Sequence, residues 1–243
     1  MDILQRLSIK PFCIVGHRGA KGVKPENTIS AIEYGIKSGA DIVEVDVRKT
    51  KDGKLILLHD KDFKRLTGRA LSPSDLDFEF IKENITIDGE PVATLEEAVQ
   101  IVNKRAGLFI EIKEPETTEQ IVKTVKEKNA ESWVAFISFY EEALIEVKKI
   151  DNSLKTGIIY MRPPGKIIEA KKIGAEIVLP LYKLATEKAV AFAHRLKLKV
   201  VSWVINDFET AKIMYERKTD AIASDYPDKA VKWREMLRGG KSP

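Results

Sequence analysis

The sequence predicts a closed (β/α)₈ barrel, in which eight parallel strands lie inside a ring of helices. Three observations carry this prediction. The chain has 243 residues, a length at which such barrels form one domain. Short apolar, β-branched runs alternate with amphipathic stretches. These runs are apolar on both faces, which is typical of parallel strands buried under helices. An open, doubly wound sheet is the alternative fold.

Nine apolar runs are candidate strands, and they make eight barrel units when the third run is counted as a continuation of the second. Each unit is followed by a stretch with helical periodicity. The chain therefore repeats a strand and a helix eight times, as a closed barrel requires. In chain order the runs are Phe12–His17, Asp41–Val47, Leu55–His59, Leu108–Lys113, Val134–Phe139, Thr156–Tyr160, Glu176–Leu179, Val200–Ile205 and Ala221–Asp225.

The helices between these runs have recognisable ends. Thr28 precedes an amphipathic stretch that ends at Gly39. The sequence Thr94-Leu95-Glu96-Glu97 is a capping box, in which the threonine and the second glutamate satisfy each other's backbone amides. Further helices are expected over 117–128, 141–149, 165–173, 186–196, 207–217 and 227–237.

Residues 60–91 interrupt the repeat. This stretch is charged and weakly patterned, and its apolar residues include Leu76, Phe78, Phe80 and Ile81. It predicts a small insertion after the second strand that caps one mouth of the barrel. The chain 1–243 is therefore expected to form a single barrel domain with a small insertion at about 60–91.

Composition restricts the classes of function. The 41 basic and 37 acidic residues are well mixed and give a net charge of +4, whereas a nucleic-acid binder gathers its basic residues into a stripe. No stretch approaches 18 apolar residues, and the N-terminus lacks the pattern of a secretory signal. The one cysteine, Cys13, lies in an apolar run and is expected to be buried and reduced. We expect a cytoplasmic protein without a nucleic-acid partner or stable membrane insertion, and the sequence does not indicate its oligomeric state.

The run Asp41–Val47 places two carboxylates on a face that would otherwise be apolar. Successive side chains of a strand point to opposite faces, so the three valines face the helices while Glu44 and Asp46 face the lumen. Burying unpaired carboxylates is costly. Glu44 and Asp46 therefore need a cation.

The run Leu108–Lys113 repeats this pattern. Its alternation directs Glu111 and Lys113 inward, and Glu111 is expected to meet the two carboxylates of the second strand at the carboxyl ends of neighbouring strands. Three hard oxygen donors suit Mg²⁺ or Ca²⁺ better than Zn²⁺. In the alternative interpretation, a carboxylate of the second strand simply pairs with Arg48, Lys113 or another base.

Two histidines stand where apolar runs end. His17 and His59 would each be structural if taken alone. Beside three carboxylates they suit general acid and base catalysis, because imidazole titrates near neutral pH. Arg18 and Lys113 supply the positive charge that a phosphate group needs, and the glycines flanking His17-Arg18 would let a phosphate approach the backbone. The third histidine, His194, lies in a helical stretch and is expected to be a surface or packing residue.

Three further residues admit more than one role. Trp203 is expected to face the lumen with Val201 and Ile205, either as core packing or against an apolar or glycerol-like group of a ligand. Asn27 has three candidate roles, which are to cap a helix, to tie down the first loop or to contact phosphate. Asp225 is assigned to helix capping.

Taken together, these residues resemble the glycerophosphodiester phosphodiesterase (GDPD) family. The resemblance runs over nearly the whole barrel and keeps the order His-Arg-Gly, Glu-x-Asp, His-Asp and Glu-Ile-Lys. The matching stretches are GHRGA (16–20), PENTISAIEYGIKSGADIVEVDVRKTKDGKLILLHD (25–60), LTG (66–68), FIEIK (109–113), SF (138–139), VSWVIN (201–206) and SDYP (224–227).

The resemblance implies a TIM (β/α)8 barrel that hydrolyses glycerophosphodiesters, small-molecule substrates, to sn-glycerol 3-phosphate and an alcohol. It also implies a divalent metal ion, for which Mg²⁺ or Ca²⁺ is expected and Mn²⁺ is suitable. The matching positions are Glu44, Asp46 and Glu111 as metal ligands, His17 and His59 as the acid–base pair, and Arg18 and Lys113 as phosphate contacts.

In-line displacement at phosphorus needs one group to take a proton from the nucleophile and another to protonate the leaving alkoxide. We assign His17 as the base and His59 as the acid, with water or the glycerol hydroxyl of the substrate as nucleophile. Two rival functions remain. A lysophospholipase D acting on lysophospholipids would share the site and have a more apolar entrance. A non-catalytic binder of phosphorylated ligands would hydrolyse nothing.

Overall fold

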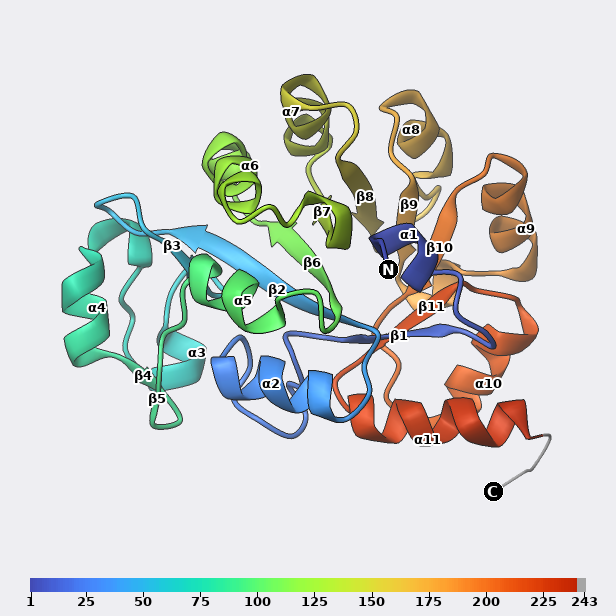
Figure 1. The fold of residues 1–243 in the computed structure, drawn as a ribbon, viewed down its shortest axis with the longest axis horizontal. Coiled ribbons are helices and arrows are strands. Elements are labelled where there is room, and N and C mark those ends of the chain that lie inside the picture. The colour runs from blue at the N-terminus through green and yellow to red at the C-terminus, as the bar shows by residue number, and fades with distance from the viewer. Residues whose placement is uncertain (240–243) are drawn as a thin grey trace.

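Eight parallel strands close into a barrel in the computed structural model, which describes residues 1–239 (Figure 1). The strands follow the order β1-β11-β10-β9-β8-β7-β6-β2, and pairing of β1 with β2 completes the ring. Closure excludes the open, doubly wound alternative. The barrel strands are β1 (Cys13–Gly16), β2 (Ile42–Lys49), β6 (Gly107–Ile112), β7 (Val134–Ser138), β8 (Lys155–Tyr160), β9 (Ile177–Pro180), β10 (Lys199–Ser202) and β11 (Ala221–Ser224).

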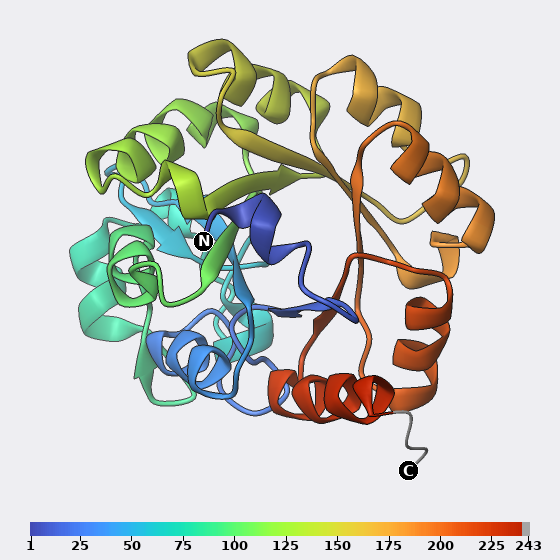
Figure 2. The same ribbon diagram turned by 45° about the vertical axis from the view of Figure 1, so that its right-hand side comes forward.

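Helices surround the barrel, as the view in Figure 2 shows. The predicted helix starts are confirmed, because Thr28 accepts a bond from the amide of Ala31 and Thr94 forms a capping box with Glu97. The surrounding helices are α2 (Ile29–Lys37), α5 (Leu95–Val102), α6 (Thr118–Glu127), α7 (Glu141–Ile150), α8 (Ile167–Lys172), α9 (Glu187–Arg195), α10 (Phe208–Glu216) and α11 (Pro227–Arg238), with 3₁₀ turns η2 (Pro115–Thr117), η3 (Glu131–Trp133) and η4 (Tyr182–Leu184).

Apolar side chains form two layers on either side of the strands. The three valines of β2 pack under the helices, while Ile42 and Phe109 pack in the lumen, as the alternation predicts. The predicted inward position of Ile205 is wrong. Its side chain packs in the outer layer, because β10 ends at Ser202 and strand alternation no longer applies beyond it.

The third apolar run is not a continuation of the second strand. It forms β3 (Leu55–Leu57), which runs antiparallel to the end of β2. The chain reverses through Gly53, whose φ of +89° favours glycine. This hairpin brings the backbone of His59 back to β2, where its carbonyl accepts two bonds from the Arg48 guanidinium. The histidine that ends the third run is thereby placed at the end of the second strand.

The segment 60–91 forms a small unit beside β2 and β3, seen at the left of Figure 1. Side chains of Phe63, Ile81 and Ile85 pack there against Ile56 and Leu58, which makes a separate apolar cluster. The elements of the unit are α3 (Lys64–Thr67), η1 (Pro73–Asp75), α4 (Phe78–Asn84), β4 (Thr86–Ile87) and β5 (Glu90–Pro91).

The short helix α1 (Ile3–Arg6) covers the end of the barrel at which the strands begin, as Figure 2 shows. Ile3 and Leu7 pack into the lumen cluster from that end. Apolar side chains from α1 therefore fill the lumen at the end where the strands begin. Within the described residues, none of the helices combines the length and the apolar character needed to cross a bilayer.

Candidate active site

A cavity of about 450 Å³ opens at the carboxyl ends of the strands, where barrel active sites lie. Its polar residues all follow or belong to β1, β2, β3 and β6, and most of the remaining wall is apolar. Within residues 1–239, no side chain from 60–91 lines it, so the insertion contributes nothing to the wall of this cavity. The lining residues are Val15, His17, Arg18, Lys21, Glu44, His59, Phe109, Glu111, Ile137, Phe139, Ile159, Met161, Leu179, Val201, Trp203, Val204 and Ala223.

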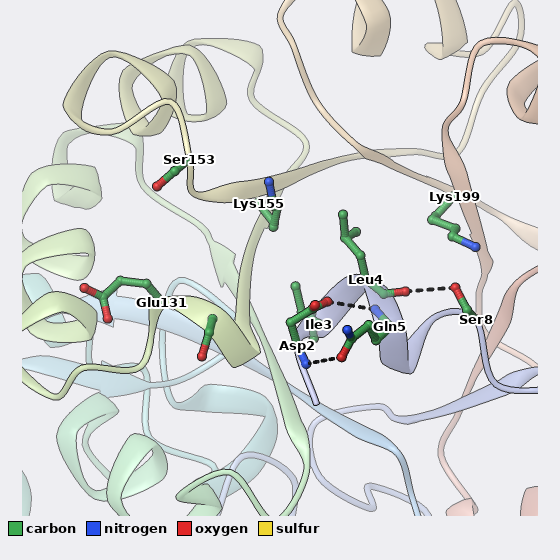
Figure 3. Close-up of a pocket in the computed structure, with 10 residues that line it drawn as sticks. Asp2, Ile3, Leu4, Gln5, Ser8, Glu131, Ser153, Lys155 and Lys199 are labelled. Atoms are coloured by element: carbon green, nitrogen blue, oxygen red, sulfur yellow. Dashed lines mark hydrogen bonds between the residues drawn. The ribbon is translucent and has the colours of Figure 1, made fainter.

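A second groove, of about 570 Å³, lies at the opposite end of the barrel between α1 and the strand starts (Figure 3). Its lysines are already paired, since Lys155 lies 3.4 Å from Glu176 and Lys199 lies 3.0 Å from Asp220. Residues at this end of a barrel serve stability rather than catalysis. The candidate chemistry is confined to the other end.

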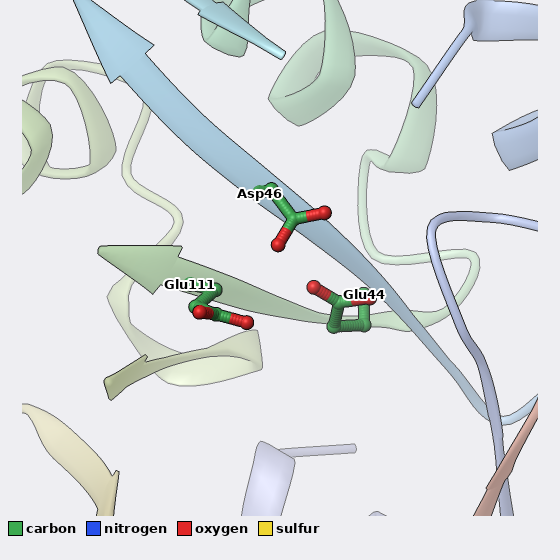
Figure 4. A group of neighbouring side chains, drawn as sticks. All are labelled: Glu44, Asp46 and Glu111. Carbon is green, nitrogen blue, oxygen red and sulfur yellow. The ribbon is translucent and has the colours of Figure 1, made fainter. Parts of the chain in front are cut away.

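Strands β2 and β6 bring three carboxylates together, as predicted. The register of the two strands aligns Asp46 with Glu111, and Glu44 lies one inward position earlier on β2. One oxygen of each carboxylate lies within 4.8 Å of one from each of the others (Figure 4). All three residues are buried. They form a cluster of hard oxygen donors, which we call the carboxylate cluster.

Burial and mutual repulsion perturb the acidity of the carboxylate cluster. Burial, followed by the charges of Asp46 and Glu111, raises the pKa of Glu44 well above its ordinary value. Burial and the charge of Asp46 raise the pKa of Glu111 to about 7. Burial would also raise the pKa of Asp46, but the charges of Lys113 and Arg18 outweigh it and hold that pKa below its usual range. Two of the three carboxyls thus lack enough positive charge around them.

The contacts within the carboxylate cluster fit a divalent cation. Oε1 of Glu44 is buried and has no hydrogen-bond partner, although Oε2 accepts a bond of 2.8 Å from the amide of Arg18. An unpartnered buried carboxylate oxygen among three acidic groups is what a metal ion would satisfy. The residues present therefore fit Mg²⁺ or Ca²⁺.

Lys113 forms one of the ion pairs that the alternative interpretation proposes. Its ammonium lies 2.7 Å from Glu111 and 3.4 Å from Asp46. Arg48, the other proposed partner, instead pairs with Glu114 at 2.8 Å. The lysine thus compensates two of the carboxylates and leaves Oε1 of Glu44 unpaired.

His17 follows β1 and is fixed by a residue that sequence reasoning assigned to another role. Its Nδ1 lies 2.6 Å from Oδ1 of Asp225, and the side-chain amide of Asn206 donates to the second oxygen of Asp225 at 2.7 Å. Asp225 is not a helix cap, because Tyr226 precedes α11 and forms no side-chain cap bond. Nε2 of His17 is left for the cavity. The signal in the sequence was that Asp225 ends one apolar run and Asn206 directly follows another.

His59 is held in the same manner by the next residue in the chain. Its Nδ1 lies 2.7 Å from Oδ1 of Asp60, a contact that the pair His-Asp could have suggested. Burial lowers the pKa of His59. His17 and His59 both line the cavity, so the structure brings the two predicted histidines to one site.

The first loop is tied to β2 through Asn27 and Arg18. Asn27 donates to Oδ2 of Asp46 at 2.8 Å and accepts from the amide of Asp46 at 3.2 Å, so among its three candidate roles the structure favours tying down this loop. Nε of Arg18 lies 3.3 Å from Oδ2 of the same carboxylate. The two glycines are needed for packing, because a Cβ on Gly16 would lie 2.2 Å from the carbonyl oxygen of Gly19. A Cβ on Gly19, whose φ is +81°, would lie 2.5 Å from the backbone of Ala31 on α2, so close backbone packing accounts for both glycines.

Aromatic residues form the apolar wall of the cavity. The ring of Trp203 meets that of Phe139 edge to face, with centroids 5.9 Å apart. The indole N–H of Trp203 donates to the carbonyl of Leu179 at 2.7 Å, so the ring offers only carbon to a ligand. His194 lies away from this mouth and pairs with Asp220 at 2.8 Å, as expected of a packing residue.

Known proteins resemble this chain over almost its whole length. The sequence profile of the Glycerophosphoryl diester phosphodiesterase family matches residues 17–229. The "Glycerophosphodiester phosphodiesterase" of Caldanaerobacter subterraneus subsp. tengcongensis is 30% identical over 234 residues, which cover 90% of this chain and 96% of that protein. A protein of the same name from Bacillus altitudinis is 29% identical over 244 residues, with 93% and 99% covered.

Solved structures share the fold. The glycerophosphodiester phosphodiesterase of Thermotoga maritima superposes with a TM-score of 0.78 at 26% identity, covering 92% of this chain and 98% of that one. An Oleispira antarctica phosphodiesterase, solved in complex with the product sn-glycerol-3-phosphate, gives a TM-score of 0.83 at 23% identity, with 92% and 96% covered. The barrel described above is the common architecture of these chains.

Proposed function

Since this chain belongs to the glycerophosphoryl diester phosphodiesterase family, we propose that it hydrolyses glycerophosphodiesters to sn-glycerol 3-phosphate and an alcohol, using a divalent metal ion and two histidines. The observation that carries the proposal is that His17, His59 and two members of the carboxylate cluster, Glu44 and Glu111, line one cavity, while Asp46 lies beside those two carboxylates. The product bound by the Oleispira antarctica enzyme is the one we assign to this chain, which supports the same reaction.

The two histidines divide the proton transfers between them. With Nδ1 bonded to Asp225, neutral His17 presents an unprotonated Nε2, which takes the proton of the nucleophile. His59, with Nδ1 bonded to Asp60, donates a proton from Nε2 to the leaving alkoxide. Its lowered pKa makes the protonated ring a readier donor. The nucleophile is water or the glycerol hydroxyl of the substrate.

Positive charge around the carboxylate cluster prepares the site for a phosphodiester anion. Arg18 and Lys113 are charged and largely buried, so they stabilise the phosphoryl oxygens with little screening by water. A Mg²⁺ or Ca²⁺ ion held by the carboxylate cluster would add Lewis acidity at the same oxygens. Together these charges offset the repulsion that protects a phosphodiester from attack.

A second candidate function is hydrolysis of lysophospholipids, and the apolar wall favours it. Phe139 and Met161 are 37% and 50% exposed at the rim of the cavity, and Trp203 offers only its ring. Such a wall suits an acyl chain, whose burial contributes about 0.8 kcal/mol per CH₂. Both candidates use the same histidines and carboxylate cluster.

The test is a substrate panel with the purified protein and added Mg²⁺ or Ca²⁺. Glycerophosphocholine is compared with lysophosphatidylcholines of six to ten acyl carbons, used below the concentrations at which they aggregate. Release of sn-glycerol 3-phosphate supports the first function, and a kcat/KM that rises with chain length supports the second. Binding of the diesters without any hydrolysis would contradict both and favour a non-catalytic binder.

We also propose that the protein acts in the cytoplasm. Its one cysteine, Cys13, is buried and free, as a chain from a reducing compartment would have it. Fractionation of cells that express the protein tests this, and recovery of the activity outside the cytoplasmic fraction would contradict it.

A further inference from the structure

A chain of polar contacts joins the insertion to both functional halves of the active site. Arg65, on α3, donates from Nε to Oδ2 of Asp60 at 2.6 Å. Its two terminal nitrogens bind the carboxylate of Glu26 at 2.9 and 2.6 Å. Asp60 holds Nδ1 of His59, and Glu26 accepts a bond of 2.7 Å from Arg18. One guanidinium therefore touches the partner of the acid histidine and the partner of the phosphate arginine.

The centre of this chain is buried. Glu26 is only 5% exposed and shares one oxygen, Oε1, between Arg18 and Arg65. Burial would raise the pKa of Glu26, but the two guanidinium groups outweigh it and keep the pKa below its ordinary value. The Glu26 carboxylate is therefore held firmly between its two arginines. Removing either arginine would leave a buried negative charge with less compensation.

We propose that Arg65 is a positioning residue of the active site, which orients His59 through Asp60 and Arg18 through Glu26. The proposal rests on the proposed function for the roles of His59 and Arg18. Arg65 itself does not line the cavity, so it acts through these partners and not on the substrate. The insertion thus supports the active site from beside the opening of the cavity.

Arginine is the side chain that this geometry requires. Three of its N–H groups are used at once, and its planar fork fits the Glu26 carboxylate with two parallel bonds. Lysine carries the same charge but cannot hold both acids in fixed directions. A substitution by lysine therefore separates the effect of charge from the effect of orientation.

The test compares Arg65→Gln and Arg65→Lys with Arg69→Gln and Arg69→Lys. Arg69 is a matched control, since it is an exposed arginine of the same insertion that donates to the backbone carbonyl of Asn84. Well below each unfolding midpoint, kcat and KM are measured with glycerophosphocholine, and binding of sn-glycerol 3-phosphate is measured by calorimetry. We expect kcat/KM to fall about 10- to 100-fold in the Arg65 variants, as for other outer partners of catalytic groups. The Arg69 variants should match the wild type.

Double variants that combine Arg65→Gln with Asp60→Asn or with Glu26→Gln separate the effect through Asp60 from the effect through Glu26. Adding Arg65→Gln to Asp60→Asn should no longer change kcat, and adding it to Glu26→Gln should no longer weaken product binding. If Arg65 is merely structural, its variants lower the unfolding midpoint but keep wild-type kcat, KM and product affinity, which would overturn the proposal. Should Arg65→Gln not fold, wild-type values in Arg65→Lys have the same meaning. If the wild type binds the product but hydrolyses no diester, the proposed function is refuted. The calorimetric measurement of product binding in the Arg65 variants would still test whether Arg65 positions Arg18.

Discussion

Replacing Glu111 by glutamine should stabilise the metal-free protein at alkaline pH. The substitution keeps the shape of the side chain and an oxygen that accepts from Lys113, and it removes one charge from the carboxylate cluster. If the carboxylate cluster binds a cation, its third negative charge destabilises the folded protein whenever the cation is absent. If Glu111 instead serves as an ion-pair partner of Lys113, its charge stabilises the folded protein.

The structure sets the size and the pH range of the effect. Burial and Asp46 raise the pKa of Glu111 from 4.5 to about 7, which corresponds to a cost of about 3 kcal/mol for ionising it in the folded state. A folded-state pKa above the unfolded value stabilises the protein fully below pH 4.5, and the contribution is lost as the pH rises through about 7. The metal-free wild type should therefore lose stability between these values, and Glu111→Gln should avoid the loss.

Guanidinium unfolding in EDTA measures this at pH 5 and pH 8. We expect Glu111→Gln to exceed the wild type by about 1–3 kcal/mol at pH 8, with a much smaller difference at pH 5. Glu114→Gln is the control, because Glu114 pairs with Arg48 outside the carboxylate cluster. A Glu111→Gln protein that is less stable than the wild type at pH 8 would refute the reasoning and identify the Lys113 pair as structural.

Three further predictions concern the reaction. His17→Ala and His59→Ala should each lower kcat about 10²- to 10⁴-fold without changing the unfolding midpoint, and near-normal turnover in either variant would make that histidine structural. Metal affinity, followed by activation titrations, should fall as the pH drops through about 7, because Glu111 must release a proton to bind the ion; equal affinity at pH 6 and 8 contradicts this. Asp225→Asn should lower kcat by at least about tenfold with little change in KM, since the amide can turn its NH2 group toward Nδ1 of His17 and then no longer fixes the tautomer of the ring, and an unchanged kcat would show that Asp225 does not orient the ring.

The inward carboxylates could be predicted because strand alternation is a local property. The apolar side chains of β2 and β6 alternate between the outer layer and the lumen as their positions in the runs imply. The inward positions of Glu44 and Glu111 could therefore be predicted without the rest of the fold. The same rule failed at Ile205, which lies beyond the last residue of β10. Alternation holds only as far as the strand does.

The partner of His17 depends on tertiary structure, and sequence reasoning missed it. Asp225 lies 208 residues from His17 and reaches it only because closure pairs β1 with β11, with Gly16 opposite Ser224. Arg65 likewise binds Glu26 across 39 residues because the insertion folds back beside the first loop. The first contact follows from the register of barrel closure and the second from the way the insertion packs, and no local sequence pattern specifies either.

The central claim, that the carboxylate cluster holds a metal ion needed for hydrolysis, is tested most directly by ³¹P NMR of glycerophosphocholine turnover. The protein is exhaustively chelated, assayed, and assayed again after addition of Mg²⁺, Ca²⁺ or Mn²⁺, with Glu44→Gln in parallel. We predict that the sn-glycerol 3-phosphate signal appears in the wild type only after metal is added, and that Glu44→Gln needs much more metal, because it loses the oxygen that the fold leaves unpaired. Full turnover by the chelated wild type would contradict the account.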